Sequence, residues 1–478
     1  MSSDVDIAAP GIGLPEGDEA EGQPGVWRRA IDNLKTGNLG ILPIGLGLVL
    51  IIVFFSFKAT NFFTADNFNN IIVQMAGLTM LAFGVVFVLL LGEIDLSIGY
   101  LSGIAALAVA EFQLPGSGHA YPGVIAILIA IGICAGIGAA QGSVVAYVGV
   151  PSFVVTLAGL LIWQGVILQV LEVKGVIVIQ DTLINDLANY YFTPNAGWLI
   201  AAIVTGLYTL GTLGGVIGKR RAHVAIQRPW LIVAKVLGVA LACFGTVAIS
   251  NHAKVPAGLP LAGVLVVIFL IALTYLAKRT PFGRHVYAVG GNAEAARRAG
   301  INVARIRIIV FLISGAMAGV GGVILAARLN SVDLNVGGGT LLLDAISAAV
   351  IGGTSLFGGR GEVRSALIGA LVIATVSNGL DTAGYKTGTI YIVTGVILLL
   401  AVTLDTVARR LQVRSGRCFF SGRCPRSSAA RAPKPPGRSL NRAGGQRGHR
   451  EPSASPRRDL RSPLRRRCAD TEGCRFPP

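Results

Sequence analysis

The chain has 478 residues, of which 53% are hydrophobic and 14% charged, and its mean hydropathy is +0.67. This composition excludes a water-soluble globular protein and favours a chain that crosses a lipid bilayer many times. Residues 413–478 hold 17 Lys and Arg against 4 Asp and Glu, whereas residues 1–412 hold 24 against 20. The net charge of +17 therefore resides mainly in the tail, and we expect no nucleic-acid partner.

Residues 1–39 are polar and do not resemble a secretory signal, so we expect a cytoplasmic N-terminal segment. From residue 40 to 407, apolar windows long enough to cross a bilayer recur. They predict an all-α polytopic membrane protein with about twelve hydrophobic segments, ten to twelve of them full spans: 40–57, 71–91, 97–112, 122–147, 152–171, 197–217, 230–249, 260–278, 306–327, 342–357, 364–382 and 388–405. The third and tenth are short, and each is a candidate re-entrant or broken segment.

Lys and Arg are distributed unevenly among the loops. The N-terminal flank and the loops after even-numbered segments hold 18, whereas the loops after odd-numbered segments hold 5. Cytoplasmic loops of membrane proteins carry the excess of positive charge. We therefore expect both termini in the cytoplasm.

Glycines occur within and between the segments. Gly132-x-x-x-Gly136 and Gly315-x-x-x-Gly319 have the spacing that lets membrane helices approach closely. The first glycine-rich break, Gly92–Gly99, also carries two carboxylates.

A carboxylate at membrane depth costs at least about 2.5 kcal/mol unless it is paired or hydrated. Glu93 and Asp95 therefore either line an aqueous pathway or hold a gate, or act locally, with Asp95 or Ser97 capping the next helix. Capping is the stronger interpretation for Asp95, whereas it explains Glu93 poorly.

The basic loop, residues 279–305, is long for a connection between spans. Asn292 is placed to cap a short helix, Glu294 suits its positive end, and Gly300 can end it. Ala295, Ala296 and Ala299 would form a slim face for a soluble partner. An ordinary basic loop that fixes topology explains the same residues equally well.

The second glycine-rich break, Gly352–Gly361, lacks the Lys-Ser/Thr pair of a P-loop, so we interpret it as an interrupted helix. Leu81–Gly99 and Leu343–Gly361 share the order helix, break, helix, a weak indication of an internal repeat. Asp344, on the short tenth segment, is a further pathway candidate.

The sequence contains no recognisable catalytic set, metal-ligand cluster or cofactor motif, so we predict a protein that is not an enzyme. Residues 408–478 form a basic tail that we expect to be disordered. We interpret the tail from residue 413 as a non-native extension.

Four segments together resemble the permease subunits of bacterial ABC sugar importers, in particular the xylose type: Gly92–Gly99, Val150–Gly159, Tyr287–Val303 and Gly352–Gly361. The resemblance covers about residues 40–407. It implies a cytoplasmic-membrane permease with an ATPase partner that binds a coupling helix within residues 290–303. It also implies a periplasmic or lipid-anchored sugar-binding protein and a permease homodimer. Two additional spans within residues 172–260 are similar to those of the xylose-type members.

By this resemblance the ATPase-coupling residues are Gly290, Gly291, Asn292, Glu294, Ala295, Ala296, Arg297 and Gly300. A neutral pentose needs partners for its hydroxyl groups, so Asn69, Asn70 and Gln74 join Glu93, Asp95 and Asp344 as pathway or gating candidates. The three amides could equally hydrogen-bond between helices. The alternative function is an ion-coupled secondary transporter, which would need paired ionisable groups near mid-membrane.

Overall fold

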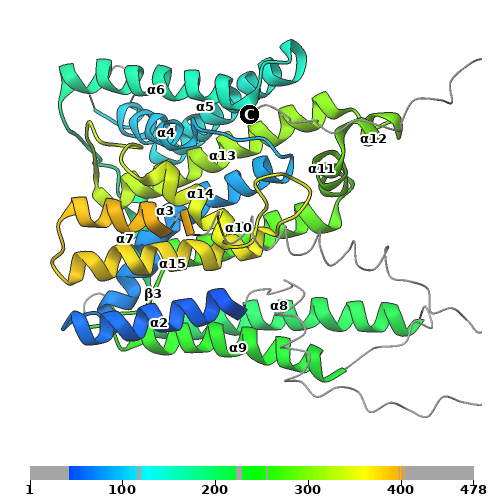
Figure 1. The fold of residues 1–478 in the computed structure, drawn as a ribbon. Helices are drawn as coiled ribbons and strands as arrows, with labels where there is room; N and C mark the ends of the chain where they lie inside the picture. Colours follow the sequence, from blue (N-terminus) through cyan, green and yellow to red (C-terminus); the bar gives the residue numbers. More distant parts are fainter. Residues whose placement is uncertain are drawn as a thin grey trace, which may run out of the picture. The chain divides into compact units, whose positions relative to one another are not determined.

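The computed structural model describes residues 42–115, 120–221, 229–254, 257–397, 399–400 and 403. The predictions for residues 1–39 and 408–478 concern residues outside these ranges. The long helices run alongside one another, and α11 and α12 lie at the right-hand ends of the helices in Figure 1.

The helices, in chain order, are α2 (Leu42–Lys58), α3 (Ala65–Leu90), α4 (Ile98–Phe112), α5 (Gly123–Ser143), the π-helix η1 (Val144–Val148), α6 (Ser152–Lys174), α7 (Thr182–Asn189), α8 (Pro194–Arg221), α9 (Pro229–Asn251), α10 (Leu261–Arg279), α11 (Pro281–Gly291), α12 (Ala293–Arg298), α13 (Val303–Leu329), α14 (Leu341–Ile351) and α15 (Val363–Thr382). Four two-residue strands form two antiparallel pairs: β1 (Ile177–Val178) with β4 (Ser331–Val332), and β2 (Tyr191–Phe192) with β3 (Leu259–Pro260).

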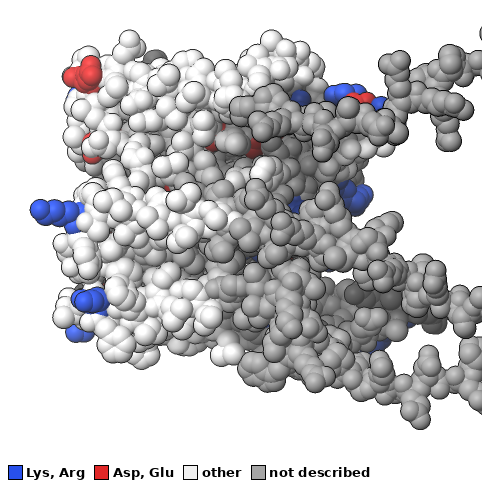
Figure 2. All heavy atoms as spheres, viewed as in Figure 1, with Lys and Arg blue, Asp and Glu red and all other residues white. Residues whose placement is uncertain are grey.

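Eight helices in the described part are long and apolar enough to cross a membrane. Four shorter apolar helices accompany them: Ile44–Lys58 within α2, Ile98–Phe112 (α4), Leu341–Ile351 (α14) and a further helix without a label, Thr387–Ile397. Each predicted hydrophobic segment therefore contains an apolar helix, and the polytopic all-α class is confirmed. The face drawn in Figure 2 is consistent with this class, because its Lys and Arg side chains lie toward the two ends of the helices.

The third and tenth segments are short, as predicted. α4 has 15 residues and α14 has 11. The tenth segment was predicted to reach residue 357, but its helix ends at Ile351. The reason is local: Gly353 adopts φ +89°, a left-handed conformation that a helix cannot continue through.

α13 lies at the centre of the packing and contacts α5, α3 and α4. A Cβ added at Gly315 would lie 2.2 Å from the carbonyl oxygen of Cys134, and one at Gly319 would lie 2.9 Å from the Ile131 Cα. Close approach at these two glycines is therefore confirmed. It is not found at Gly132 and Gly136, where an added Cβ meets nothing within 4 Å, because α5 turns its other face to α13.

Candidate functional site

The basic loop folds into two helices. In α12 the predicted cap is confirmed, because Oδ1 of Asn292 accepts a hydrogen bond from the Ala295 amide at 2.9 Å. Gly300 follows the helix with φ +83°, as expected of a terminating glycine.

α11 was not predicted. Its start carries a recognisable signal: the Thr280 side chain accepts a hydrogen bond from the Gly283 amide, and Pro281 occupies the first turn.

Only part of the alanine face of α12 is available to another protein. Ala295 and Ala299 are exposed, but Ala296 is only 5% exposed. Ala296 packs on its own chain, and its carbonyl accepts a hydrogen bond from the Ile301 amide at 3.0 Å. The prediction that Ala296 belongs to the slim outward face is therefore wrong, because this side chain anchors the helix.

The charged residues of α12 form a local network on its exposed surface. Glu294 pairs with Arg297 at 2.8 Å and with Arg298 at 3.2 Å. Exposed pairs of this kind contribute little to stability, about 0.3–0.5 kcal/mol each. Their main effect is to fix the pattern of charge that α12 presents to its surroundings.

The end of α11 contacts both glycine-rich breaks at what we call the glycine junction, formed by Leu90, Gly92, Gly290, Gly358 and Gly359. The Gly359 amide donates a hydrogen bond to the Leu90 carbonyl at 2.9 Å. A Cβ at Gly290 would lie 1.7 Å from that carbonyl oxygen, and one at Gly358 would lie 2.7 Å from the Gly290 carbonyl oxygen. Only glycine permits such close backbone contact, so the junction joins three segments distant in sequence.

A second contact links the start of α13, the helix that follows α12, to the first break. A hollow of about 340 Å³ lies beside α12, lined by Ala146, Arg297, Gly300, Ile301, Asn302, Val303, Ala304 and Arg307. From this hollow Arg307 reaches Glu93 and forms an ion pair of 3.0 Å, with side chains that are 28% and 15% exposed. This pair supplies the partner for Glu93 that the sequence left unexplained.

Asp95 is fully engaged in hydrogen bonds inside the protein. It accepts bonds from the amide and hydroxyl of Ser97, at 3.0 and 2.7 Å, and from the Ser314 hydroxyl at 2.8 Å. The Ser97 hydroxyl also lies 3.0 Å from Oε1 of Gln141. Asp95 thus organises the turn before α4 and ties it to α13, so its role is local. The side chain of Ser97, the N-cap residue of α4, makes no capping hydrogen bond, so capping by Ser97 is not found.

The second break is held by charge at the start of α15. Glu362 accepts hydrogen bonds from Lys278 at 2.6 Å and from Arg364 at 2.5 Å, and Tyr287 donates to the Gly361 carbonyl at 2.8 Å. Burial acts to raise the pKa of Glu362, but these two cations and their hydrogen bonds outweigh it and hold the pKa below its ordinary value. Glu362 therefore links α10 to α15 as an ionised carboxylate.

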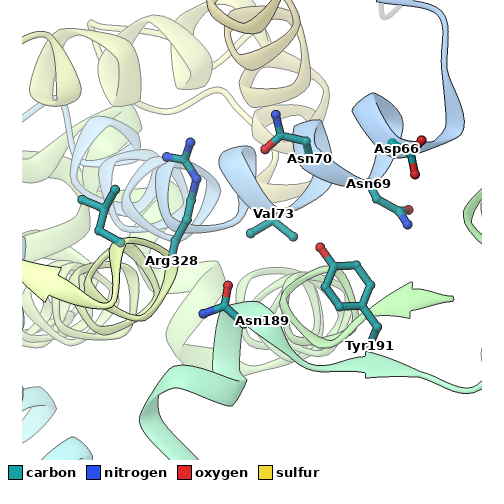
Figure 3. A pocket seen from close by; sticks show the side chains of 8 residues that line it. Asp66, Asn69, Asn70, Val73, Asn189, Tyr191 and Arg328 are labelled. Carbon is teal, nitrogen blue, oxygen red and sulfur yellow. The ribbon is translucent and has the colours of Figure 1, made fainter. Parts of the chain in front are cut away.

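A polar cavity of about 390 Å³ lies at the other end of α3 and α13, lined by Asp66, Asn69, Asn70, Val73, Asn189, Tyr191, Arg328 and Leu329 (Figure 3). Two of the predicted pathway residues, Asn69 and Asn70, are therefore brought together with four polar residues that sequence reasoning missed: Asp66, Asn189, Tyr191 and Arg328. Asn189, Tyr191 and Arg328 gave no signal, because each lies at the end of an element far away in the chain.

The remaining pathway candidates lie outside this cavity. Gln74 lies one helical turn beyond Asn70 on α3, and its Oε1 is buried without a partner among the described residues. Asp344 is half-buried in the first turn of α14 and accepts a hydrogen bond from the Thr340 hydroxyl at 2.7 Å. Along α3, 21 residues separate Asn69 from Leu90 of the glycine junction, a distance of about 32 Å.

The chain is similar in sequence to known transport permeases. The family model for branched-chain amino acid transport system / permease component matches residues 67–402. The chain is 35% identical to the xylose transport system permease protein XylH of Escherichia coli K12 over 382 residues, 79% of this chain and 94% of that protein. It is 36% identical to XylH of Haemophilus influenzae over 383 residues, 78% of this chain and 98% of the relative.

The ribose import permease protein RbsC of Escherichia coli K12 is 31% identical over 360 residues, 75% of this chain and 92% of RbsC. No solved structure matches the chain. The predicted resemblance to sugar permeases is confirmed by these relatives. The chain belongs to the family of branched-chain amino acid transport system permease components.

Proposed function

We propose that this chain is the membrane-spanning permease subunit of an ATP-driven importer that carries a monosaccharide, most specifically xylose or a similar pentose. The printed functions of its relatives, xylose transport for XylH and ribose import for RbsC, support this substrate class. Energy comes from a separate ATPase chain, and the permease itself performs no chemistry. A periplasmic or lipid-anchored binding protein delivers the sugar to a permease homodimer in the bacterial cytoplasmic membrane.

The observation that carries the proposal is the fold of the basic loop and its contact with both breaks. The ATPase binds the exposed side of α12, formed by Ala295, Ala299 and the Glu294 network, on the cytoplasmic side. The excess of positive charge in the loops after even-numbered segments supports that side. Asn292 caps α12, Gly300 ends it, and Arg297 contributes to its charge. Gly291 connects α12 to α11, and the buried side chain of Ala296 packs α12 against its own chain.

When the ATPase displaces α12, two sets of contacts transmit the movement to the membrane helices. Gly290 transmits it to the glycine junction, and Arg307 transmits it to Glu93. Both sets of contacts end at interruptions between helices, where small backbone rotations move the flanking α3, α4, α14 and α15 as rigid bodies. Glu93 and Asp95 thereby act in gating, and Asp344 lies at the start of α14, which such a rotation would move.

The test uses the permease expressed with its ATPase and binding protein. Glu294→Arg reverses the charge at the start of α12 and places three arginines together, so we expect ATPase co-purification and sugar uptake to fall at least about tenfold, equivalent to about 1.4 kcal/mol of binding. Glu172→Arg, the same change at an exposed position near the end of α6, is the matched control and should leave both unchanged.

Normal uptake by Glu294→Arg would contradict the coupling proposal. Uptake that needs an ion gradient and no ATPase would instead support the secondary transporter.

A further inference from the structure

We infer that the cavity at the end of α3 is a binding subsite for a neutral polyhydroxylated ligand, a monosaccharide ring, within the permease itself. This inference rests on the proposed function and assigns the subsite to Asn69, Asn70, Asn189, Tyr191 and Arg328. At about 390 Å³ the cavity is at the small end of the range for small-molecule sites, about 300–1,000 Å³.

The cavity is assembled from separate elements. Figure 3 shows Asn189 and Tyr191 extending from α7 and β2 toward α3, while Asn70 and Arg328 project into the space from α3 and the end of α13. The pairing of β2 with β3 fixes the position of Tyr191 beside α3. In ligand sites, a few polar groups that converge on one concave space fix the orientation of the ligand and provide specificity.

The side chain of Asn69 is buried and has a hydrogen-bond acceptor without a donor, which costs free energy. Asn69 is only 3% exposed; its Nδ2 donates to the Gly258 carbonyl at 3.2 Å, while its Oδ1 has no partner among the described residues. A buried acceptor without a donor costs about 1–3 kcal/mol. A sugar hydroxyl entering the cavity would supply that donor.

Two other lining residues, Asn189 and Arg328, differ in how far the described part of the chain engages their polar groups. Nδ2 of Asn189 is held by the Ala327 carbonyl at 2.8 Å and by Oδ1 of Asn330 at 3.0 Å, which fixes its side chain in place. The half-buried guanidinium of Arg328 forms no ion pair within 4.0 Å among the described residues, although Asp381 interacts with it electrostatically. The lining therefore combines a carboxamide held in a fixed position with a guanidinium that has no ion-pair partner among the described residues.

The charge of the lining selects the ligand class. Asp66 and Arg328 are the only ionisable side chains of opposite sign in the lining, so their formal charges cancel. A cavity with no net charge and three carboxamides suits a neutral molecule whose hydroxyl groups both donate and accept. The half-buried ring of Tyr191 adds an apolar surface against which the C–H face of a pyranose can pack.

The test measures binding of D-xylose to the full-length permease in lipid nanodiscs, without the binding protein, by saturation-transfer NMR titration. Tyr191→Phe removes one hydroxyl and keeps the ring, so we expect about a fivefold weaker affinity for xylose, the usual effect of one lost neutral hydrogen bond. Asn70→Ala should weaken it similarly. Tyr190→Phe, the same change at the neighbouring residue outside the cavity lining, is the matched control and should leave the affinity unchanged.

In the binding titration, three results would overturn the subsite: no xylose binding by the wild type, equal affinities in all four proteins, or tighter binding of xylose 5-phosphate than of xylose. Xylose uptake by the reconstituted wild-type complex is measured in parallel. Uptake without a difference among the variants refutes the subsite alone, whereas a wild-type complex that carries no monosaccharide refutes the proposed function.

Discussion

Gly290 and Gly291 are adjacent, yet they occupy very different surroundings, and this difference gives the sharpest prediction. A Cβ added at Gly290 would lie 1.7 Å from the Leu90 carbonyl oxygen, 2.8 Å from its carbon and 2.9 Å from the Gly359 amide nitrogen. A Cβ added at Gly291 meets nothing within 4 Å. Gly290→Ala should therefore disrupt the glycine junction, whereas Gly291→Ala should not.

The expected magnitude follows from these contacts. Non-bonded carbon atoms prefer separations of about 3.5–4.0 Å, so the new methyl group at residue 290 requires the backbone to move. Overpacking costs about 1–3 kcal/mol, and the displaced Leu90 carbonyl also loses its hydrogen bond from Gly359, worth about 1 kcal/mol. Gly290→Ala should thus destabilise the folded permease by about 2–4 kcal/mol. Gly291→Ala should be neutral or slightly stabilising, because alanine favours the helix.

The assay is thermal unfolding of each purified permease, together with sugar uptake normalised to the amount of permease in the membrane. We expect Gly290→Ala to unfold at a lower temperature and to lose uptake even at equal abundance. Wild-type stability and uptake in Gly290→Ala would refute the close packing of the junction. An equal loss of stability and uptake in both variants would show that the flexibility of the two glycines, and not the close contact of Gly290, is required.

Three further predictions concern charge and the tail. Glu93→Gln leaves the partly buried Arg307 unpaired and should lower stability by about 1–3 kcal/mol; a double-mutant cycle with Arg307→Gln should recover part of that loss. Because the folded-state pKa of Glu362 is depressed, its stabilising contribution is present above its ordinary pKa of 4.5 and is lost as the pH falls through the lower folded value. Unfolding temperatures measured across that acid range should fall less steeply for Glu362→Gln than for the wild type. Ending the chain after Leu411 should leave uptake unchanged, and a loss of uptake at normal abundance would show that the tail has a function.

Local features were predictable because their physical causes lie within a few residues. Hydropathy located every apolar helix, since burial in lipid requires a continuous run of apolar side chains. The start of α12 at Asn292 and its end at Gly300 could also be predicted, because the groups that cap a helix lie within a few residues of its ends. The outward position of Ala296 was not, because burial of one side of a short helix depends on what packs against it.

Only the tertiary structure brought together residues that are distant in the chain. Three contacts join helices, breaks and a strand that are far apart in the sequence: the Glu93–Arg307 pair, the contact of Gly290 with Leu90 and Gly359, and the approach of Tyr191 and Arg328 to Asn69. Helix contacts in a membrane depend on matching small residues and single polar groups, which leave no periodic pattern along the chain. The sequence alone thus determined an apolar helical protein with two breaks and a capped basic loop. Packing between the helices decided that the loop contacts both breaks and that a polar cavity forms about 32 Å away along α3.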